Sequence, residues 1–246
     1  MLRSGGLGFR VRDLPVLGVS LLISRLSGRP LRASLIRPVV VESEDGLRWH
    51  FGNTEAGTDD WLAFSAHHEK SITKLLTDLS QSTKKFVDVG AHVGRYSVRL
   101  ATHVVAVTAF DPNPTSRKIL LENLRLNGVN KCEVLSFALG SEEGRAHLIE
   151  RGGSSRLVQS GDGDVQVRPM DALNLDPELI KVDTEGYEVE VLGGAIETLR
   201  RCRPKLLIEV HADSNFADCV KIINEVGYSR VEKMLDGNEV FIWAEP

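Results

Sequence analysis

The chain has 246 residues, 42% hydrophobic and 26% charged, with a formal net charge of −4, which favours a folded globular domain over a disordered chain and argues against nucleic acid as a partner. Its three cysteines, Cys132, Cys202 and Cys219, lie far apart in the sequence and show no zinc-binding spacing. This cysteine usage is typical of proteins in a reducing cytoplasm.

Residues 1–38 form a basic arm with seven arginines against one aspartate, which leaves a net charge of −10 on the remaining chain. The apolar run 14–23 is too short to span a bilayer. Two main interpretations remain: an arm or short helix that packs on the domain, or a basic anchor at the surface of an acidic membrane. A cleaved signal peptide is a third, although Asp13 and Pro15 fit it poorly. We expect a cytoplasmic protein, with peripheral membrane contact through this arm as the alternative.

Residues 39–83 are predicted to form a hairpin and a helix that precede the core. Asp45 and Gly46 are a turn signal between two β-rich runs in the segment 39–51. Apolar residues at steps of three and four predict a helix over 60–80. His68 lies on the apolar stripe of that helix, where we expect a buried histidine with a neighbouring partner.

Strands and helices alternate from residue 84 to residue 246. Patterning predicts strands at 86–89, 104–110, 132–137, 180–183 and 206–211, and helices at 94–102, 114–126, 187–201 and 216–226. The segment 140–168 is rich in Gly, Ser and Asp and is predicted to be an extended or β insertion. The chain closes on a hairpin over 228–243. This order predicts an α/β fold with a doubly wound, mostly parallel sheet and one antiparallel edge strand.

The sequence KFVDVGAHVGRYS, residues 85–97, joins the first core strand to a helix. Ligands of open α/β sheets bind at the carboxyl ends of the strands, where this loop lies. Its glycines follow a G-x-x-x-G pattern with His92 at the place of the middle glycine of a dinucleotide-binding loop, and no G-K-[ST] follows. The loop therefore suits close approach of a ligand better than binding of phosphate.

Two carboxylates narrow the expected ligand further. Asp88 would repel a phosphate but attract an ammonium group. Asp111 ends the second core strand, where an acid can accept hydrogen bonds from ribose hydroxyls. A ligand with a ribose, an ammonium group and no phosphate is S-adenosylmethionine. The alternative is that both acids only cap helices.

Six motifs follow one another in a fixed order along residues 86–211. They are FVDVGAHVGRYSVRLA, VTAFDPNPTSRKILLENLRLNGV, SFALGSEEG, PMDAL, IKVDTEGYEVEVLGGAIETL and PKLLIEVH. Together they resemble the FkbM-type S-adenosylmethionine-dependent methyltransferases. The resemblance implies a Rossmann-like methyltransferase fold with a seven-stranded sheet, and O-methylation of a hydroxyl on a sugar, a polyketide or another small metabolite.

The resemblance also implies contacts with S-adenosylmethionine. The loop 88–94 would face the methionine part, Asp111 would bind the ribose, and the residues after the third strand would border the adenine. The family usually carries Asn at position 92 and often Glu at position 111. The predicted cofactor-binding residues are Asp88, Gly90, Ala91, His92, Gly94, Asp111, Pro112, Asn113, Phe137 and Ala138.

Four titratable residues are predicted to be catalytic. Asp183 and Glu185 follow the fourth core strand, and Glu209 and His211 end the fifth, so adjacent strands would bring them together. Methyl transfer to a hydroxyl needs alignment of the reactants and a base. His211 is the first candidate for that base because its pKa suits neutral pH, and Asp183 is the second. Glu185 and Glu209 would orient substrate hydroxyls.

Several alternatives stay open for this site and for the function. Glu185 and Glu188 would also be favoured by the dipole of the following helix, and a divalent cation could lie between the carboxylates, although no metal is predicted. Ser154, Ser155 and Arg156 could form a substrate lid or an ordinary loop. A catalytically inactive scaffold of the same fold is the competing function, and an NAD-dependent oxidoreductase is disfavoured by the missing glycine. The sequence indicates neither the methyl acceptor nor the oligomeric state.

Overall fold

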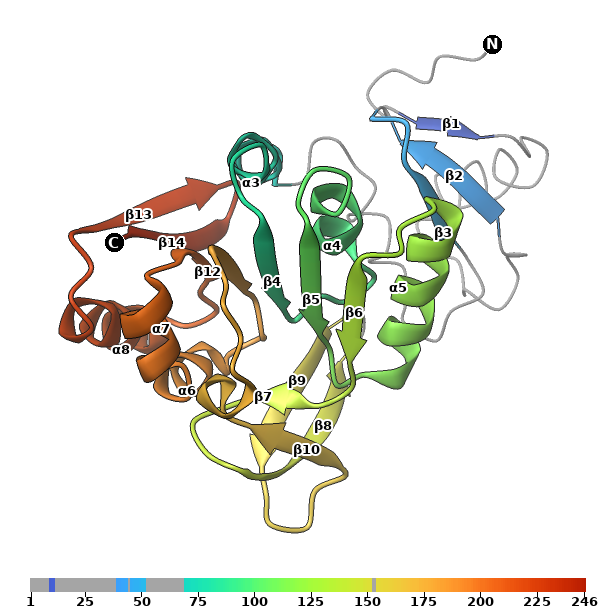
Figure 1. The fold of residues 1–246 in the computed structure, drawn as a ribbon. Helices are drawn as coiled ribbons and strands as arrows, with labels where there is room; N and C mark the ends of the chain where they lie inside the picture. Colours follow the sequence, from blue (N-terminus) through green and yellow to red (C-terminus); the bar gives the residue numbers. More distant parts are fainter. Residues whose placement is uncertain (1–8, 12–38, 44, 52–68, 152–153) are drawn as a thin grey trace.

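The computed structural model describes residues 9–11, 39–43, 45–51, 69–151 and 154–246 (Figure 1). The core of this described part is a seven-stranded sheet with the order β13-β14-β12-β11-β4-β5-β6. Its strands are β4 (Lys85–Val89), β5 (Ala106–Phe110), β6 (Cys132–Leu135), β11 (Leu179–Val182), β12 (Lys205–Glu209), β13 (Arg230–Asp236) and β14 (Glu239–Glu245).

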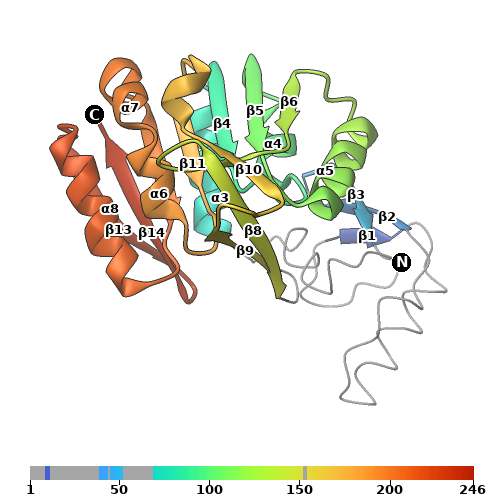
Figure 2. The same ribbon diagram turned by 90° about the horizontal axis from the view of Figure 1, so that it is seen from below.

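Helices cover both faces of this sheet (Figures 1 and 2). Phe86 of β4 packs with α3 and α4 on one face, whereas Val87 and Val89 pack with α6 and α7 on the other, as the alternation of side chains along a strand requires. The residues of β11 and β12 are almost all buried, as expected for central strands covered on both faces. The helices are α3 (Lys70–Ser80), α4 (Arg95–Leu100), α5 (Pro114–Leu126), α6 (Glu188–Gly193), α7 (Ile196–Cys202) and α8 (Asp213–Glu225).

The predicted fold class is confirmed, and the position of the antiparallel strand is a correction. That strand is β14, which pairs with β12 on one side and with β13 on the other, so the edge strand β13 runs parallel to the core strands. Phe241, Ile242 and Ala244 of β14 are fully buried, whereas β13 is mostly exposed. The more apolar strand of the final hairpin therefore takes the inner position.

The bounds of one predicted helix agree with the structure, and another predicted helix is divided in two. The helix predicted over 114–126 is α5, whose first turn is capped by the Asn113 side chain, which accepts from the backbone N–H of Thr115 at 2.8 Å. The helix predicted over 187–201 is divided into α6 and α7 around Gly194. A Cβ at Gly194 would lie 1.9 Å from the carbonyl oxygen of Gly140, so the chain bends where it meets the insertion.

The insertion after β6 forms a second sheet, as predicted. Its strands are β7 (Ala138–Leu139), β8 (Gly144–Arg151), β9 (Ser154–Gln159) and β10 (Val165–Arg168), in the order β7-β10-β8-β9. Figure 1 shows this sheet beyond the carboxyl ends of β4 and β5. A short 3-10 helix (Met170–Leu173) leads back to β11. The insertion is therefore placed where ligands of α/β sheets bind.

A third, small sheet precedes the core. Strands β2 (Val39–Ser43) and β3 (Arg48–Phe51) form the predicted hairpin, and β1 (Phe9–Val11), which we did not predict, pairs with β2. Helix α3 confirms the second half of the helix predicted over 60–80. The first half, including His68, and most of the basic arm lie outside the described residues.

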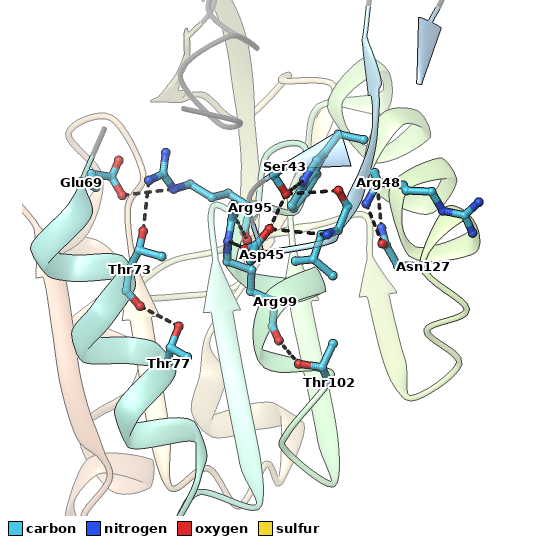
Figure 3. A network of polar contacts seen from close by, with 12 residues as sticks. Ser43, Asp45, Arg48, Glu69, Thr73, Thr77, Arg95, Arg99, Thr102 and Asn127 are labelled. Carbon is cyan, nitrogen blue, oxygen red and sulfur yellow. Dashed lines mark hydrogen bonds and ion pairs between the residues drawn. The ribbon is translucent and has the colours of Figure 1, made fainter. Parts of the chain in front are cut away.

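Polar contacts attach this hairpin to the core (Figure 3). Arg99 Nε donates to Asp45 Oδ2 at 2.8 Å, and its guanidinium lies 4.9 Å from the ring centre of Trp49. Trp49 is fully buried, and its indole N–H donates to Ser43 Oγ at 2.9 Å. The backbone of Arg48 donates to Asn127 Oδ1 at 2.8 Å. The hairpin is thus held by α4 and by the end of α5.

The division of the chain into 1–38, 39–83 and 84–246 stays a prediction. Within the described part of the chain, no helix combines the length and the hydropathy needed to cross a bilayer. Cys132, Cys202 and Cys219 are free thiols.

Candidate active site

A cavity lies between the carboxyl ends of β4, β5 and β11 and the insertion sheet. Gly90 and His92 line it from the loop after β4, and Asp183 and Glu185 line it from the loop after β11. The insertion contributes apolar walls through Leu148 and Leu157. Six of the ten predicted cofactor-binding residues line this cavity: Gly90, His92, Asp111, Pro112, Asn113 and Ala138.

The two glycines of the G-x-x-x-G loop serve close packing. Gly90 has φ +77°, and a Cβ there would lie 1.7 Å from the backbone oxygen of Asp183. Gly94 has φ +89°, and a Cβ there would lie 2.3 Å from Leu120. Glycine at position 90 therefore lets the loop after β4 contact the loop after β11 directly.

His92 also adopts a left-handed backbone conformation, with φ +50°. Its backbone N–H donates to Asp111 Oδ2 at 2.7 Å, which fixes the turn. Asparagine and histidine are both enriched in this conformation, which accounts for the asparagine that the family resemblance implies at this position. The side chain of His92 lines the cavity.

Asp111 is a buried carboxylate on the cavity wall, with 6% of its surface exposed. Besides the bond from His92, its Oδ1 accepts from the backbone N–H of Asn113 at 2.8 Å. Burial raises the pKa of Asp111 to about 6. Each carboxylate oxygen keeps a second lone pair, so Asp111 can still accept hydrogen bonds from ligand hydroxyls.

Asp88 is not among the residues that line the cavity, and its expected contact with a ligand ammonium stays a prediction. Its side chain points to the α3 and α4 face of the sheet, where Oδ2 accepts from Ser97 Oγ at 2.6 Å. Oδ1 is buried and has no hydrogen-bond partner among the described residues. The neighbouring cation is Lys181, directly opposite on β11. Burial raises the pKa of Asp88, and the alternation along β4 explains why it turns away from the cavity.

Three other predicted cofactor residues also lie outside the cavity lining. Ala91 is buried in the core beside α5, and Gly94 packs against Leu120. Phe137 contacts Phe110 edge to face, with ring centres 5.5 Å apart. These residues support the cavity walls.

The four predicted catalytic residues do converge, around the imidazole of His211. Its Nε2 lies 3.4 Å from Glu209 Oε1, 3.6 Å from Glu185 Oε2 and 3.7 Å from Asp183 Oδ1. A fifth residue, Glu188, lies 3.2 Å from His211 Nδ1. We call these five residues the acid–histidine cluster.

Glu188 is the member of the cluster to which we had assigned only a helix-dipole role. Its side chain is fully buried and accepts from the backbone N–H of Gly186 at 2.8 Å and from Asn215 Nδ2 at 3.0 Å. Although burial alone raises its pKa, the bonds from His211, Asn215 and Gly186 hold it below the ordinary value. Glu188 is therefore a firm anchor for the imidazole.

The carboxylates determine the protonation of His211. Burial alone lowers the pKa of this imidazole, but hydrogen bonds to Glu188 and Glu209 and the nearby charge of Asp183 raise it to about 11. A raised pKa favours the imidazolium over the neutral imidazole that a general base needs, so these surroundings disfavour His211 as the base, and that role stays a prediction. Burial and the charge of Asp183 raise the pKa of Glu209 to about 7. Burial also raises the pKa of Glu185.

The same cluster includes atoms at metal-ligand spacing. Asp183, Glu209 and His211 each offer one ligand atom within 4.8 Å of the others. Oxygen and imidazole ligands at such distances could hold a divalent cation, so this alternative stays open.

Hydrogen bonds also indicate the roles of Ser155, in the insertion, and of Asp171, in the PMDAL motif. Ser155 lines the cavity, and its Oγ accepts from Asn113 Nδ2 at 2.9 Å, so the insertion contacts the loop after β5. Asp171 accepts from the backbone N–H groups of Glu197 and Thr198 at the start of α7, at 3.0 and 2.7 Å. Asp171 is thus a helix cap, and Ser155 belongs to the cavity.

Comparison of the amino-acid sequence with known proteins finds one family and one curated relative. A family model described as the methyltransferase FkbM domain matches residues 88–230. The hexuronic acid methyltransferase AglP of Haloferax volcanii is 25% identical to this chain over 222 residues, which cover 86% of this chain and 91% of the relative.

Solved structures show the same fold. The methyltransferase FkbM of Methylobacillus flagellatus KT has a TM-score of 0.51 at 21% identity, over 65% of this chain and 43% of its own. Trm5b of Pyrococcus abyssi also has a TM-score of 0.51, at 18% identity, over 85% of this chain and 55% of its own. The chain spans about half the length of these two proteins. The likeness shows a Rossmann-like methyltransferase fold.

Proposed function

We propose that this chain, which belongs to the FkbM methyltransferase family, transfers a methyl group from S-adenosylmethionine to a hydroxyl of a sugar or another small metabolite. Membership of this family supports methyl transfer as the reaction. The donor and the acceptor are our proposal. The observation that carries it is a single cavity that joins Asp111, at one end, to Asp183 and Glu185, at the other.

The cavity suits S-adenosylmethionine in its polarity as well as its position. The free lone pairs of Asp111 match ribose hydroxyls, and Leu148 and Leu157 offer apolar surface. The acidic end suits the positive sulfonium and ammonium groups, a role that falls to Asp183 and Glu185 in place of Asp88. When bound there, S-adenosylmethionine supplies an electrophilic methyl group.

The acidic end also offers a base for the acceptor. Glu185 lines the cavity and burial raises its pKa, so we assign it the proton of the acceptor hydroxyl. Asp183 accepts a hydrogen bond from a second hydroxyl of the acceptor and so orients it. His211 and Glu209 do not line the cavity, so we assign the His211 cation a supporting role: it faces the carboxylates of Asp183 and Glu185. Glu188 and Glu209 hold its ring.

The charge of the site favours a hydroxyl acceptor over a carboxylate. AglP is a hexuronic acid methyltransferase, and a hexuronic acid carries both kinds of group. Asp183, Glu185 and Glu209 would repel a substrate carboxylate but accept hydrogen bonds from hydroxyls. A carboxylate acceptor would also need no base.

The test is transfer of a labelled methyl group to a panel of neutral hexosides and hexuronates, followed by mild alkali. A methyl ether survives alkali, and a methyl ester is hydrolysed. We expect an alkali-stable product from the wild type and none from heat-denatured protein. Release of the label by alkali would refute the hydroxyl acceptor, and a folded wild type that binds no S-adenosylhomocysteine would refute the donor.

A further inference from the structure

Lys181 is a charged side chain in the middle of a buried strand. Only 4% of its side chain is exposed, and its neighbours Ile180 and Val182 are almost fully buried. Removing an ammonium group from water costs several kcal/mol unless it is paired. The sequence pattern of an apolar strand gives no reason for a lysine there, so its partners must explain it.

Lys181 lies between the core and the acid–histidine cluster. Its Nζ is 2.9 Å from Asp183 Oδ2 and 5.3 Å from the ring centre of Tyr96. Although burial alone lowers its pKa, Asp183, Asp88 and Glu69 raise it above the ordinary value. The ammonium therefore stays charged. The titratable groups that face it are Asp88, Asp183, Glu69 and Tyr96, with Glu185 and Glu209 further away.

Asp183 is contacted by a cation on each side. Oδ2 bonds to Lys181 below the cavity, and Oδ1 faces His211 Nε2 at 3.7 Å. The backbone of Asp183 is fixed as well, because its N–H donates to the carbonyl of Val89 at 3.0 Å and its own carbonyl packs on Gly90. With the backbone held, the bond from Lys181 decides where the carboxylate points.

We propose that Lys181 is a positioning residue for the methyl transfer, which acts through Asp183 by holding that carboxylate in the position where it lines the cavity. The inference rests on the proposed function for its role in turnover. The cation that orients the Asp183 carboxylate is then a side chain of the protein, the ammonium of Lys181. Lys181 touches neither donor nor acceptor, since it does not line the cavity.

The competing explanation is that Lys181 only neutralises the buried Asp88. Both explanations predict a loss of stability when the charge is removed, so stability does not separate them. They differ in whether the effect passes through Asp183. A structural role predicts the same fractional loss of activity whether Asp183 is present or not.

The direct test is the crystal structure of Lys181→Met, compared with that of the wild type. Without the bond from Nζ, we expect the Asp183 carboxylate to turn away from the position in which it lines the cavity. An Asp183 side chain in the same rotamer in both structures overturns the proposal. Should Lys181→Met fail to fold, Lys181→Gln replaces it in the same comparison. Lys181→Arg keeps the charge and is expected to keep Asp183 in place, and a turned carboxylate in this variant also overturns the proposal.

Turnover supplies a second readout. Lys181→Met is expected to lower kcat roughly 10- to 100-fold, the effect of one charge-assisted hydrogen bond, with S-adenosylhomocysteine affinity kept within a few fold. In the Asp183→Asn background the same change should have little further effect, and full additivity overturns the proposal. The comparison of crystal structures needs neither donor nor acceptor, so failure of the proposed function is seen separately in the labelled-methyl test.

Discussion

Two ionic networks in the described part of this protein differ in their balance of charge. Where the hairpin meets α4, Arg99 pairs with the single carboxylate of Asp45 and bonds the backbone oxygen of Arg95. In the acid–histidine cluster, four carboxylates surround the one imidazole of His211. A balanced pair is suited to holding two elements together, whereas an excess of carboxylates keeps protons available for chemistry.

The pKa directions follow this difference. Burial alone would raise the pKa of Asp45, but the charge of Arg99 and the hydrogen bonds hold it below the ordinary value. Glu209 shares Lys181 and His211 with other carboxylates, and burial with the charge of Asp183 raises its pKa to about 7. Partial burial is common to both carboxylates. The number of competing carboxylates around each cation decides the outcome.

The largest predicted effect belongs to the unbalanced network. Glu185→Gln keeps the shape of the proposed base and removes its charge, so kcat should fall by about 10²–10⁴. Affinity for S-adenosylhomocysteine should fall far less than kcat, because Asp183 still faces the ligand ammonium. Single-turnover transfer of a labelled methyl group measures it. Glu197→Gln, at an exposed position on α7, is the matched control and should behave as the wild type. If the Glu185→Gln variant kept more than about a third of the wild-type kcat, Glu185 would not be the base.

Alanine substitution of one glycine in each region should lower the free energy of unfolding by different amounts: Gly90 lies in the loop at the cavity, and Gly46 lies in the turn of the hairpin. Gly90→Ala combines left-handed strain with a Cβ 1.7 Å from the oxygen of Asp183, so it should cost roughly 2–4 kcal/mol in the free energy of unfolding. Gly46→Ala has similar strain, at φ +79°, but nothing within 4 Å of the new Cβ, and should cost about 1 kcal/mol. Urea unfolding compares the two. Equal losses would mean that the contact of the two loops is not as close as described.

Breaking the balanced pair should weaken the fold without harming the chemistry. Arg99→Met removes the bond to Asp45, which is partly exposed, so the free energy of unfolding should fall by about 1–3 kcal/mol. Below the unfolding transition, kcat should equal that of the wild type, as measured with the labelled donor. A tenfold loss of kcat in folded Arg99→Met would show that the hairpin network reaches the active site.

The pH dependence of stability should reveal the unbalanced network. The folded-state pKa of His211, about 11, lies above its ordinary value of 6.5, so its stabilisation is complete below pH 6.5 and is lost as pH rises towards 11. The free energy of unfolding should therefore fall by roughly 1–3 kcal/mol between pH 6.5 and 9. Chemical denaturation across this range tests it. His211→Gln should abolish the fall, and an identical slope in that variant would contradict the assignment.

The smallest predicted effect is that of metal removal. Lys181 and His211 already supply positive charge to the acidic end, so dialysis against a chelator should change kcat by less than about twofold. Activity with and without added Mg²⁺ or Mn²⁺ measures it. A large loss on chelation, restored by one of these ions, would favour the alternative of a cation held by Asp183, Glu209 and His211.

The sequence predicted those features that depend on local signals or on topology. The bounds of α5 follow from Asn113 and Pro114, a cap and a first-turn residue. Asp183 and His211 meet because they end adjacent parallel strands. The charge state of His211 was not predictable, because it depends on distances to carboxylates from three elements. Lys181 was overlooked because a single lysine in an apolar run identifies no partner.

Binding of S-adenosylhomocysteine by calorimetry, with wild type and Asp111→Ala side by side, tests the central claim that one cavity holds the donor at Asp111 next to the acidic end. We predict binding by the wild type and a loss of affinity of roughly 10- to 100-fold in Asp111→Ala, the effect of hydrogen bonds to a charged group. Asp162→Ala, at an exposed position of the insertion, should bind as the wild type. A folded wild type that binds nothing, or equal affinities for wild type and Asp111→Ala, would contradict the account.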